Sequence, residues 1–153
     1  MNIKRIITRG LKTGFALAAT TTAVIMLASD RENGSPWAAV NSVAHIVDGD
    51  DVVQPTEYAP RESWLGIGVN GTAMCVWGVL YEAGLQVTGA KSGVLPAIVG
   101  TLASYFIDYK VVPKQYTPGI EARLSPQSVW AAYAALGVTL ALSGLWNPKH
   151  IGR

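Results

Sequence analysis

The chain has 153 residues, enough for one domain of ordinary size. Half of the residues are hydrophobic and only 14% are charged, against about 25% in a typical soluble domain. This balance argues against a water-soluble protein, and a net charge of +2 is too small to indicate a nucleic-acid partner. A single cysteine, Cys75, excludes an internal disulfide and a cysteine-based metal site.

Four stretches without charged residues meet or approach the length of about 20 residues that a helix needs to cross a membrane; the third, 92–107, is slightly short and can be extended to Tyr109. They lack the alternating pattern of membrane strands, and the second and fourth lack the polar face that a soluble helix bundle needs. The sequence therefore predicts an all-α integral membrane four-helix bundle that forms one domain, 1–153. The predicted spans are residues 13–29, 63–81, 92–109 and 128–146.

The first stretch shares features with a signal peptide, because basic residues precede it and small residues end it. Cleavage after Ser29 would place Leu27 at a position that prefers a small residue. We therefore expect the segment to remain as a membrane anchor. Cleavage would instead leave three spans, with the new N-terminus outside.

The distribution of basic residues predicts the orientation. The N-terminus is basic, whereas the charged residues of the segment 30–62 are mostly acidic, with seven acids against only Arg31 and Arg61. The positive-inside rule places the N-terminus in the cytoplasm and this acidic loop outside. An even number of spans returns the C-terminus to the cytoplasm. The basic residues of the third loop, 110–123, disagree, and the two termini decide the prediction.

The acidic first loop contains an apolar segment. Ser35 can cap a helix, and Pro36 suits its first turn. Apolar residues then recur at spacings of three and four from Trp37 to Val47, which predicts an amphipathic helix over residues 36–47 on the outer membrane surface.

A dinucleotide-binding motif is excluded, although Gly66 to Gly71 has the spacing G-x-G-x-x-G. These glycines lie inside a predicted span and no acid follows at the required distance. Small residues let helices approach closely in lipid, so we expect the second and third helices to form an antiparallel hairpin packed along two stripes of small residues. The stripes are Gly68, Gly71, Cys75 and Gly78 on the second helix, and Gly93, Ala97, Gly100 and Ser104 on the third.

Four polar residues are candidates for function: Asn70, Glu82, Asp108 and His45. Asn70 lies within a span and is expected to hydrogen-bond to another helix. Ionisable residues at membrane depth are candidates for function by default, but Glu82 and Asp108 lie at span ends and on opposite membrane faces, so we expect structural ion pairs. The expected partners are Lys91 or Lys12 for Glu82, and Lys110 or Arg61 for Asp108. His45 and the acids at 48–51 could suggest a metal site, but a calcium site needs more oxygen ligands, arranged in a regular loop. We therefore expect no metal or cofactor.

The two long loops contain segments that resemble those of a known group of proteins. In the first loop, Asn41-Ser42-Val43-Ala44-His45-Ile46 follows Pro36-Trp37, and in the third Asp108-Tyr109-Lys110 precedes Pro113-Lys114, Thr117-Pro118-Gly119-Ile120-Glu121 and Leu124-Ser125. This pattern, from Ser35 onward, resembles an uncharacterised family of small multi-pass bacterial inner-membrane proteins. The resemblance implies the bacterial inner membrane and no particular activity.

No serine, histidine and acid are arranged for nucleophilic catalysis, so we expect a protein that is not an enzyme. The expected function is a non-enzymatic accessory or self-assembling membrane component, whose partners are the lipid bilayer and copies of itself or a larger membrane complex. A small oligomeric transporter or channel is the first alternative. A membrane-embedded enzyme that acts on lipid through His45, the nearby acids and the third loop ranks last.

Overall fold

The computed structural model describes residues 2–147, and every regular element in that part of the chain is helical. Four helices are long and apolar enough to cross a membrane, which confirms the predicted all-α four-helix fold. They are α1 (Ile3–Asn33), α4 (Pro60–Thr88), α5 (Val94–Phe106) with its π-helical extension η1 (Ile107–Val111), and α6 (Pro126–Leu142) with its 3₁₀ extension η4 (Ser143–Leu145). The shorter elements are α2 (Ala38–Ser42), α3 (His45–Asp48), η2 (Lys114–Tyr116) and η3 (Ile120–Ala122).

Local chemistry determines where the long helices begin and end. The Asn2 side chain accepts a hydrogen bond from the Arg5 amide at 3.0 Å, and Gly34 ends α1 in the left-handed conformation, with φ of 71°. Ser125 caps α6, and Pro126 occupies its first turn. The caps of α1 lie outside its charge-free stretch, so α1 extends beyond the predicted span 13–29 at both ends, whereas α6 begins two residues before the predicted span 128–146.

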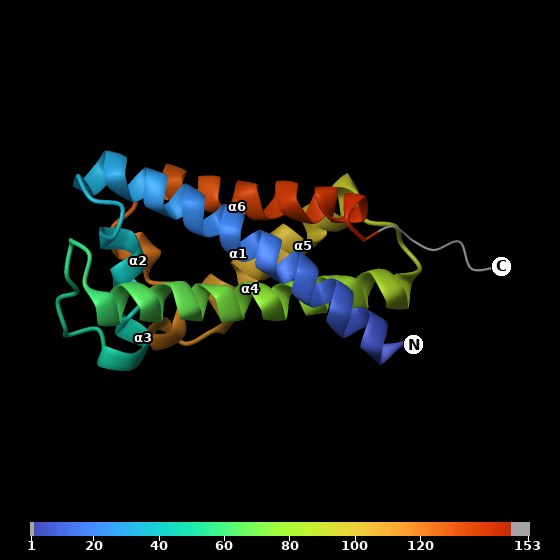
Figure 1. Ribbon diagram of the computed structural model, residues 1–153, viewed down its shortest axis with the longest axis horizontal. Coiled ribbons are helices and arrows are strands. Elements are labelled where there is room, and N and C mark those ends of the chain that lie inside the picture. The colour runs from blue at the N-terminus through green and yellow to red at the C-terminus, as the bar shows by residue number, and fades with distance from the viewer. Residues whose placement is uncertain (1, 148–153) are drawn as a thin grey trace.

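The bundle has two ends with different contents (Figure 1). At the end called here the N-terminal end, α1 begins and α4 and α6 finish; at the loop end, α1 finishes and α4 and α6 begin. The first and last described parts of the chain meet at the N-terminal end, where the Asn147 side-chain amide donates to the Arg9 carbonyl at 3.2 Å. The described chain therefore crosses the bundle an even number of times.

Helix α1 packs closely against α4 because glycines face the crossing from both sides. A side-chain carbon on Gly10 would lie 2.5 Å from the Cα atom of Val79, and one on Gly14 would lie 2.5 Å from the Cα atom of Cys75. On α4, Gly78 in turn faces the backbone of Gly10 and Gly14. Small residues at these positions allow the two backbones to touch, which is the usual way of packing helices in lipid.

The predicted hairpin between the second and third helices is wrong, because α4 and α5 barely touch. Helix α5 packs on α6 instead: a side-chain carbon on Gly137 would lie 2.8 Å from Thr101 Oγ1, and one on Gly100 would lie 3.0 Å from Leu140 Cδ1. A short connection does not force two helices together when a third helix fits better. Here α1 fits α4 better, through its own pair of glycines.

The first loop forms two short helices rather than the single surface helix predicted over residues 36–47. Helix α2 is buried along its whole length and contacts both α1 and α4 at the loop end (Figure 1). The predicted apolar face points into the protein, with Val40 4% exposed and Ala44 0% exposed, whereas Val47 is 60% exposed. Most of this face therefore belongs to the bundle core.

Specific contacts hold α2 inside the bundle. Gly66 of α4 touches the Val40 carbonyl, and any side chain at Gly66 would collide with it. From α1, the Ser29 hydroxyl donates to the Ser35 carbonyl at 2.7 Å and accepts a bond from the Ala39 amide at 3.0 Å. These bonds satisfy buried backbone groups that the short helix leaves without partners.

The middle of α1 is buried in the bundle. Thr13 and Leu17, in the middle of the helix, are both fully buried. Cleavage after Ser29 would remove the surface on which α4 and α6 pack and would expose α2.

Candidate functional sites

A cavity of about 130 Å³ lies between α1, α4 and α6 at the loop end, beneath α2 and η3. We call it the central cavity. Most of its walls are apolar, with Ile25, Val40, Ile67, Met74 and Leu136 among them. Its polar lining comes from Thr21, Thr22, Asn70, Asp108, Tyr116 and Tyr133. Two of the residues singled out in the sequence, Asn70 and Asp108, thus meet at one cavity although they lie on different helices.

Asp108 is held by hydrogen bonds and not by an ion pair. The Tyr133 hydroxyl donates to its Oδ2 atom at 2.7 Å, and the Trp77 side chain also hydrogen-bonds to the carboxyl group. No lysine, arginine or histidine of residues 2–147 lies within ion-pair distance of it. The predicted pairing with Lys110 or Arg61 is therefore wrong.

The π-helical turn η1 positions Asp108. In this turn the Val112 amide bonds back to the Ile107 carbonyl at 2.9 Å, five residues earlier. Such turns shift the side chains that follow relative to a regular α-helix and are frequent at functional sites. An aromatic cluster stabilises the turn and the Tyr133 side chain: Tyr105 stacks on Trp130 at 4.4 Å between ring centres and meets Tyr133 edge-on at 5.3 Å.

Asn70 hydrogen-bonds to another helix, as predicted. Its side-chain nitrogen donates to Thr21 Oγ1 at 3.2 Å and to Thr22 Oγ1 at 2.9 Å, both on α1. Within the described part of the chain its side-chain oxygen has no hydrogen-bond donor. Since Asn70 lines the central cavity, this oxygen is a free acceptor there.

Glu82 lies at the N-terminal end, in a cluster that has no counterpart at Asp108. Its Oε2 atom pairs with Arg9 Nε at 3.0 Å, and its Oε1 atom accepts a bond from the Asn147 side chain at 3.3 Å. Asn147 also donates to Thr13 Oγ1 at 3.0 Å and accepts a hydrogen bond from the Arg9 guanidinium on its carbonyl. The basic partner is thus Arg9, not the predicted Lys91 or Lys12, because the glycine crossing places α1 beside α4 at this level.

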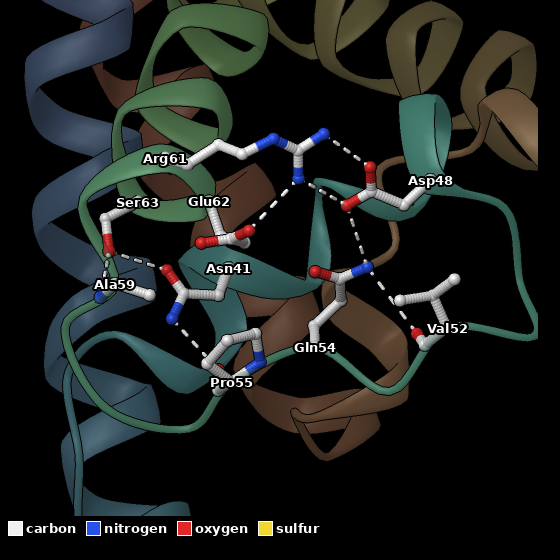
Figure 2. Close-up of polar contacts among 9 residues, drawn as sticks. All are labelled: Asn41, Asp48, Val52, Gln54, Pro55, Ala59, Arg61, Glu62 and Ser63. Carbon is white, nitrogen blue, oxygen red and sulfur yellow. Dashed lines mark hydrogen bonds and ion pairs between the residues drawn. The ribbon is translucent and has the colours of Figure 1, made fainter.

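A second polar network ties the first loop to the start of α4 (Figure 2). Arg61 binds both Asp48 oxygens, at 2.7 and 3.0 Å, and also Glu62 at 3.0 Å. Arg61 lowers the pKa of Asp48 from its ordinary value through these hydrogen bonds. Deeper in the same region, Ser63 donates to Asn41 Oδ1 at 2.8 Å. The network fixes the loop above α2 and offers no free acid to the central cavity.

His45 is held in place by the loops. Its Nδ1 atom lies 2.9 Å from the Ser42 carbonyl, and its Nε2 atom lies 3.9 Å from Asp50. Gly119, with φ of 76°, packs against the imidazole ring, where any side chain would collide. Among residues 2–147, no three histidine, cysteine or acidic side chains gather in a way that could hold a metal ion.

The predicted small-residue stripes are divided among several surroundings. Cys75 and Gly78 face α1, Gly100 meets α6, and Ala97 and Ser104 are buried. Gly68, Gly71 and Gly93 have open space where a side chain would stand. Two of these open positions, Gly68 and Gly71, lie close together on the outside of α4.

Several residues of these sites were not singled out from the sequence. Tyr133 and Trp77 lie among other aromatic residues of the apolar stretches, and Arg9 is one of four basic residues near the N-terminus, so their local sequence does not distinguish them. The run of threonines at Thr20, Thr21 and Thr22 in an otherwise apolar span was the available signal for a polar wall. Pairing them with Asn70 required knowledge of which helices touch.

Comparison with known protein families, curated proteins and solved structures found no match to this chain.

Proposed function

We propose that the protein is a non-enzymatic component of the bacterial inner membrane that assembles with a second copy of itself, with both termini in the cytoplasm. The observation that supports self-assembly is a patch on the outer face of α4, formed by Gly68, Gly71 and Thr72 and called here the glycine patch. Side-chain carbons at Gly68 and Gly71 would meet nothing within 4 Å. Thr72 is exposed beside them.

The cost of helical glycine makes this patch informative. A glycine inside a helix is less favourable than an alanine by about 1 kcal/mol. Gly66 and Gly78 on the same helix offset that cost by contacts with neighbouring backbone, whereas Gly68 and Gly71 have no such contact within one copy. A second helix at the patch would supply it, and a two-fold axis would bring the same patch of two copies together.

The test is the mass of the particle purified from native membrane in a mild detergent. We expect a dimer for the natural protein and a monomer for Gly68→Leu. Gly84→Leu is the matched control, since Gly84 is also an open position on α4 but lies away from the patch. A natural protein that is monomeric, or a Gly68→Leu variant that remains dimeric, would contradict self-assembly. A different protein at fixed stoichiometry would replace the second copy by a partner subunit.

A small transporter remains the second candidate, and the central cavity is the observation that favours it. A pore through one bundle is disfavoured, because Arg9, Glu82 and Asn147 connect α1, α4 and the end of α6 by an ion pair and hydrogen bonds at the N-terminal end. Transport would then require alternating access or a path between copies. Flux in proteoliposomes should collapse in Asn70→Ala and Asp108→Asn if these residues line the path, and should persist if they only stabilise the fold.

A further inference from the structure

Asp108 has an unusual charge environment for an acid at the end of a span. Burial of a charge in a bundle is costly unless an opposite charge or several hydrogen bonds compensate it. Tyr133 and Trp77 supply hydrogen bonds to the carboxyl group, but no cation among the described residues pairs with it. The central cavity next to it contains no basic side chain among its lining residues. A cation bound in the cavity would supply the missing charge.

The hydrogen-bonding groups that line the cavity also suit a ligand that donates hydrogen bonds. The Asn70 nitrogen is engaged by Thr21 and Thr22, which leaves its oxygen as an acceptor. The Thr21 hydroxyl donates to the Leu17 carbonyl at 2.8 Å and the Tyr133 hydroxyl donates to Asp108, so neither proton is free for a ligand. A protonated amine carries three donors and no acceptor. It therefore matches the carboxylate and the Asn70 oxygen, whereas a phosphate or carboxylate ligand would find no positive charge.

Size and wall chemistry limit the organic part of the ligand. An apolar cavity of about 150 Å³ holds a molecule as large as benzene, and the central cavity has about 130 Å³ with mostly apolar walls. A short alkyl or a small ring would fill this space. Tyr116, which lines the cavity and is 53% exposed, marks its connection to the outside at the loop end.

We infer that the central cavity is a binding site for a small organic ammonium group, with Asp108 as the counter-ion and Asn70 as the second acceptor. The ammonium group can belong to a free alkyl amine or to the ethanolamine headgroup of a lipid. This inference does not depend on the proposed self-assembly, because the glycine patch lies on the outer face of α4 and lines no part of the cavity.

The test is calorimetric titration of the purified full chain, in a detergent without lipid amines, with n-butylammonium. We expect saturable binding of one molecule per chain, and no comparable binding of n-butanol or butanoate. Asp108→Asn should weaken n-butylammonium binding at least about tenfold, because it removes the charge and keeps an acceptor for Tyr133. Absence of saturable binding, equal binding of n-butanol, or full retention of affinity in a folded Asp108→Asn variant would overturn the site.

A second variant keeps the test decisive if Asp108→Asn does not fold. Ala73 lines the cavity, so Ala73→Leu should fill the space and abolish binding while Asp108 remains. Ala131→Leu is the matched control, because Ala131 is exposed on α6, and it should bind as the natural protein does. Binding that survives in Ala73→Leu would place the amine elsewhere and overturn the inference.

Lipid composition distinguishes the two sources of the ammonium group. In nanodiscs of phosphatidylcholine and phosphatidylglycerol we expect n-butylammonium to bind as in detergent. If phosphatidylethanolamine added to the nanodiscs competes, the natural occupant is a lipid headgroup. If it does not compete, the occupant is a free amine; both results support the ammonium site itself.

Discussion

The two ends of the bundle treat an acidic residue in opposite ways. At the N-terminal end, Glu82 is 5% exposed and is paired with Arg9 and Asn147, so its charge is compensated inside the protein. At the loop end, Asp108 has hydrogen bonds but no cation from residues 2–147 and faces a cavity. The first arrangement holds helices together, whereas the second leaves the carboxyl group of Asp108 available to a ligand in the central cavity. Similar residues at similar depths thus differ in role because their neighbours differ.

The largest expected loss of stability comes from removing the cation that pairs with Glu82 at the N-terminal end. Arg9→Met should destabilise the protein by about 3–5 kcal/mol, because it leaves Glu82 as a buried charge without its partner. Thermal unfolding in detergent measures the loss. The double variant Arg9→Met with Glu82→Gln should recover part of this stability. An Arg9→Met variant as stable as the natural protein would show that the ion pair does not stabilise the contact between α1 and α4.

The next largest loss of stability is expected where α1 crosses α4 at Gly10, Gly14 and Gly78. Gly78→Leu should cost about 3 kcal/mol or more, since the backbone of α1 leaves no room for a side chain there. Gly68→Leu, on the open face of the same helix, should not destabilise the single chain and should raise its stability by up to about 1 kcal/mol, because helical glycine is unfavourable. Helical circular dichroism during heating measures both variants. Equal losses would contradict the α1–α4 crossing.

Asp108 should tolerate neutralisation far better than Glu82. Asp108→Asn keeps an oxygen that can accept the Tyr133 hydrogen bond, and no ion pair is broken, so the expected change in unfolding free energy is below about 1 kcal/mol. The same thermal measurement applies, with Glu82→Gln as the comparison. A loss for Asp108→Asn as large as that for Arg9→Met would reveal an ion pair that the geometry does not contain.

The smallest expected effect concerns the exposed network above the cavity. Since Arg61 lowers the pKa of Asp48 below its ordinary value of 3.8, the ionised pair stabilises the loop above that pH and is lost as the pH falls through the lowered value. Limited proteolysis of the first loop should accelerate below about pH 4. Asp48→Asn should remove this pH dependence, and a loop equally protected at all pH values would contradict it.

Much of the architecture could be predicted from the sequence, because membrane spans depend on local properties. The absence of charge over about 20 residues marked each long helix, and the bond from Asn70 to another helix followed from the cost of an unsatisfied amide in lipid. The helix partners could not be predicted in this way. Gly10 precedes the first predicted span and Gly14 lies at its start, and nothing local in the sequence relates them to the glycines of the second span.

The candidate sites were harder to predict, because they depend on which helices meet. A pairing of α4 with α5 gives Asn70 and Asp108 no common surface and does not bring Arg9 of α1 to Glu82. The burial of α2 could not be predicted either, because an apolar face at helical spacing fits a membrane surface and a protein core equally well. Gly66, which admits the Val40 carbonyl, decides between them only once the two segments are known to touch.

The most direct test of the contrast between the two ends is the reactivity of single cysteines in a Cys75→Ala background. Asn70→Cys would place a thiol in the central cavity, and Thr13→Cys would place one at a fully buried position in the cluster of Arg9, Glu82 and Asn147. We predict that water-soluble thiosulfonates modify Asn70→Cys and leave Thr13→Cys unreacted, with a cationic reagent faster than an anionic one because Asp108 attracts it. Equal reactivity at both positions, or a faster anionic reagent, would contradict an open acidic cavity opposite a locked end.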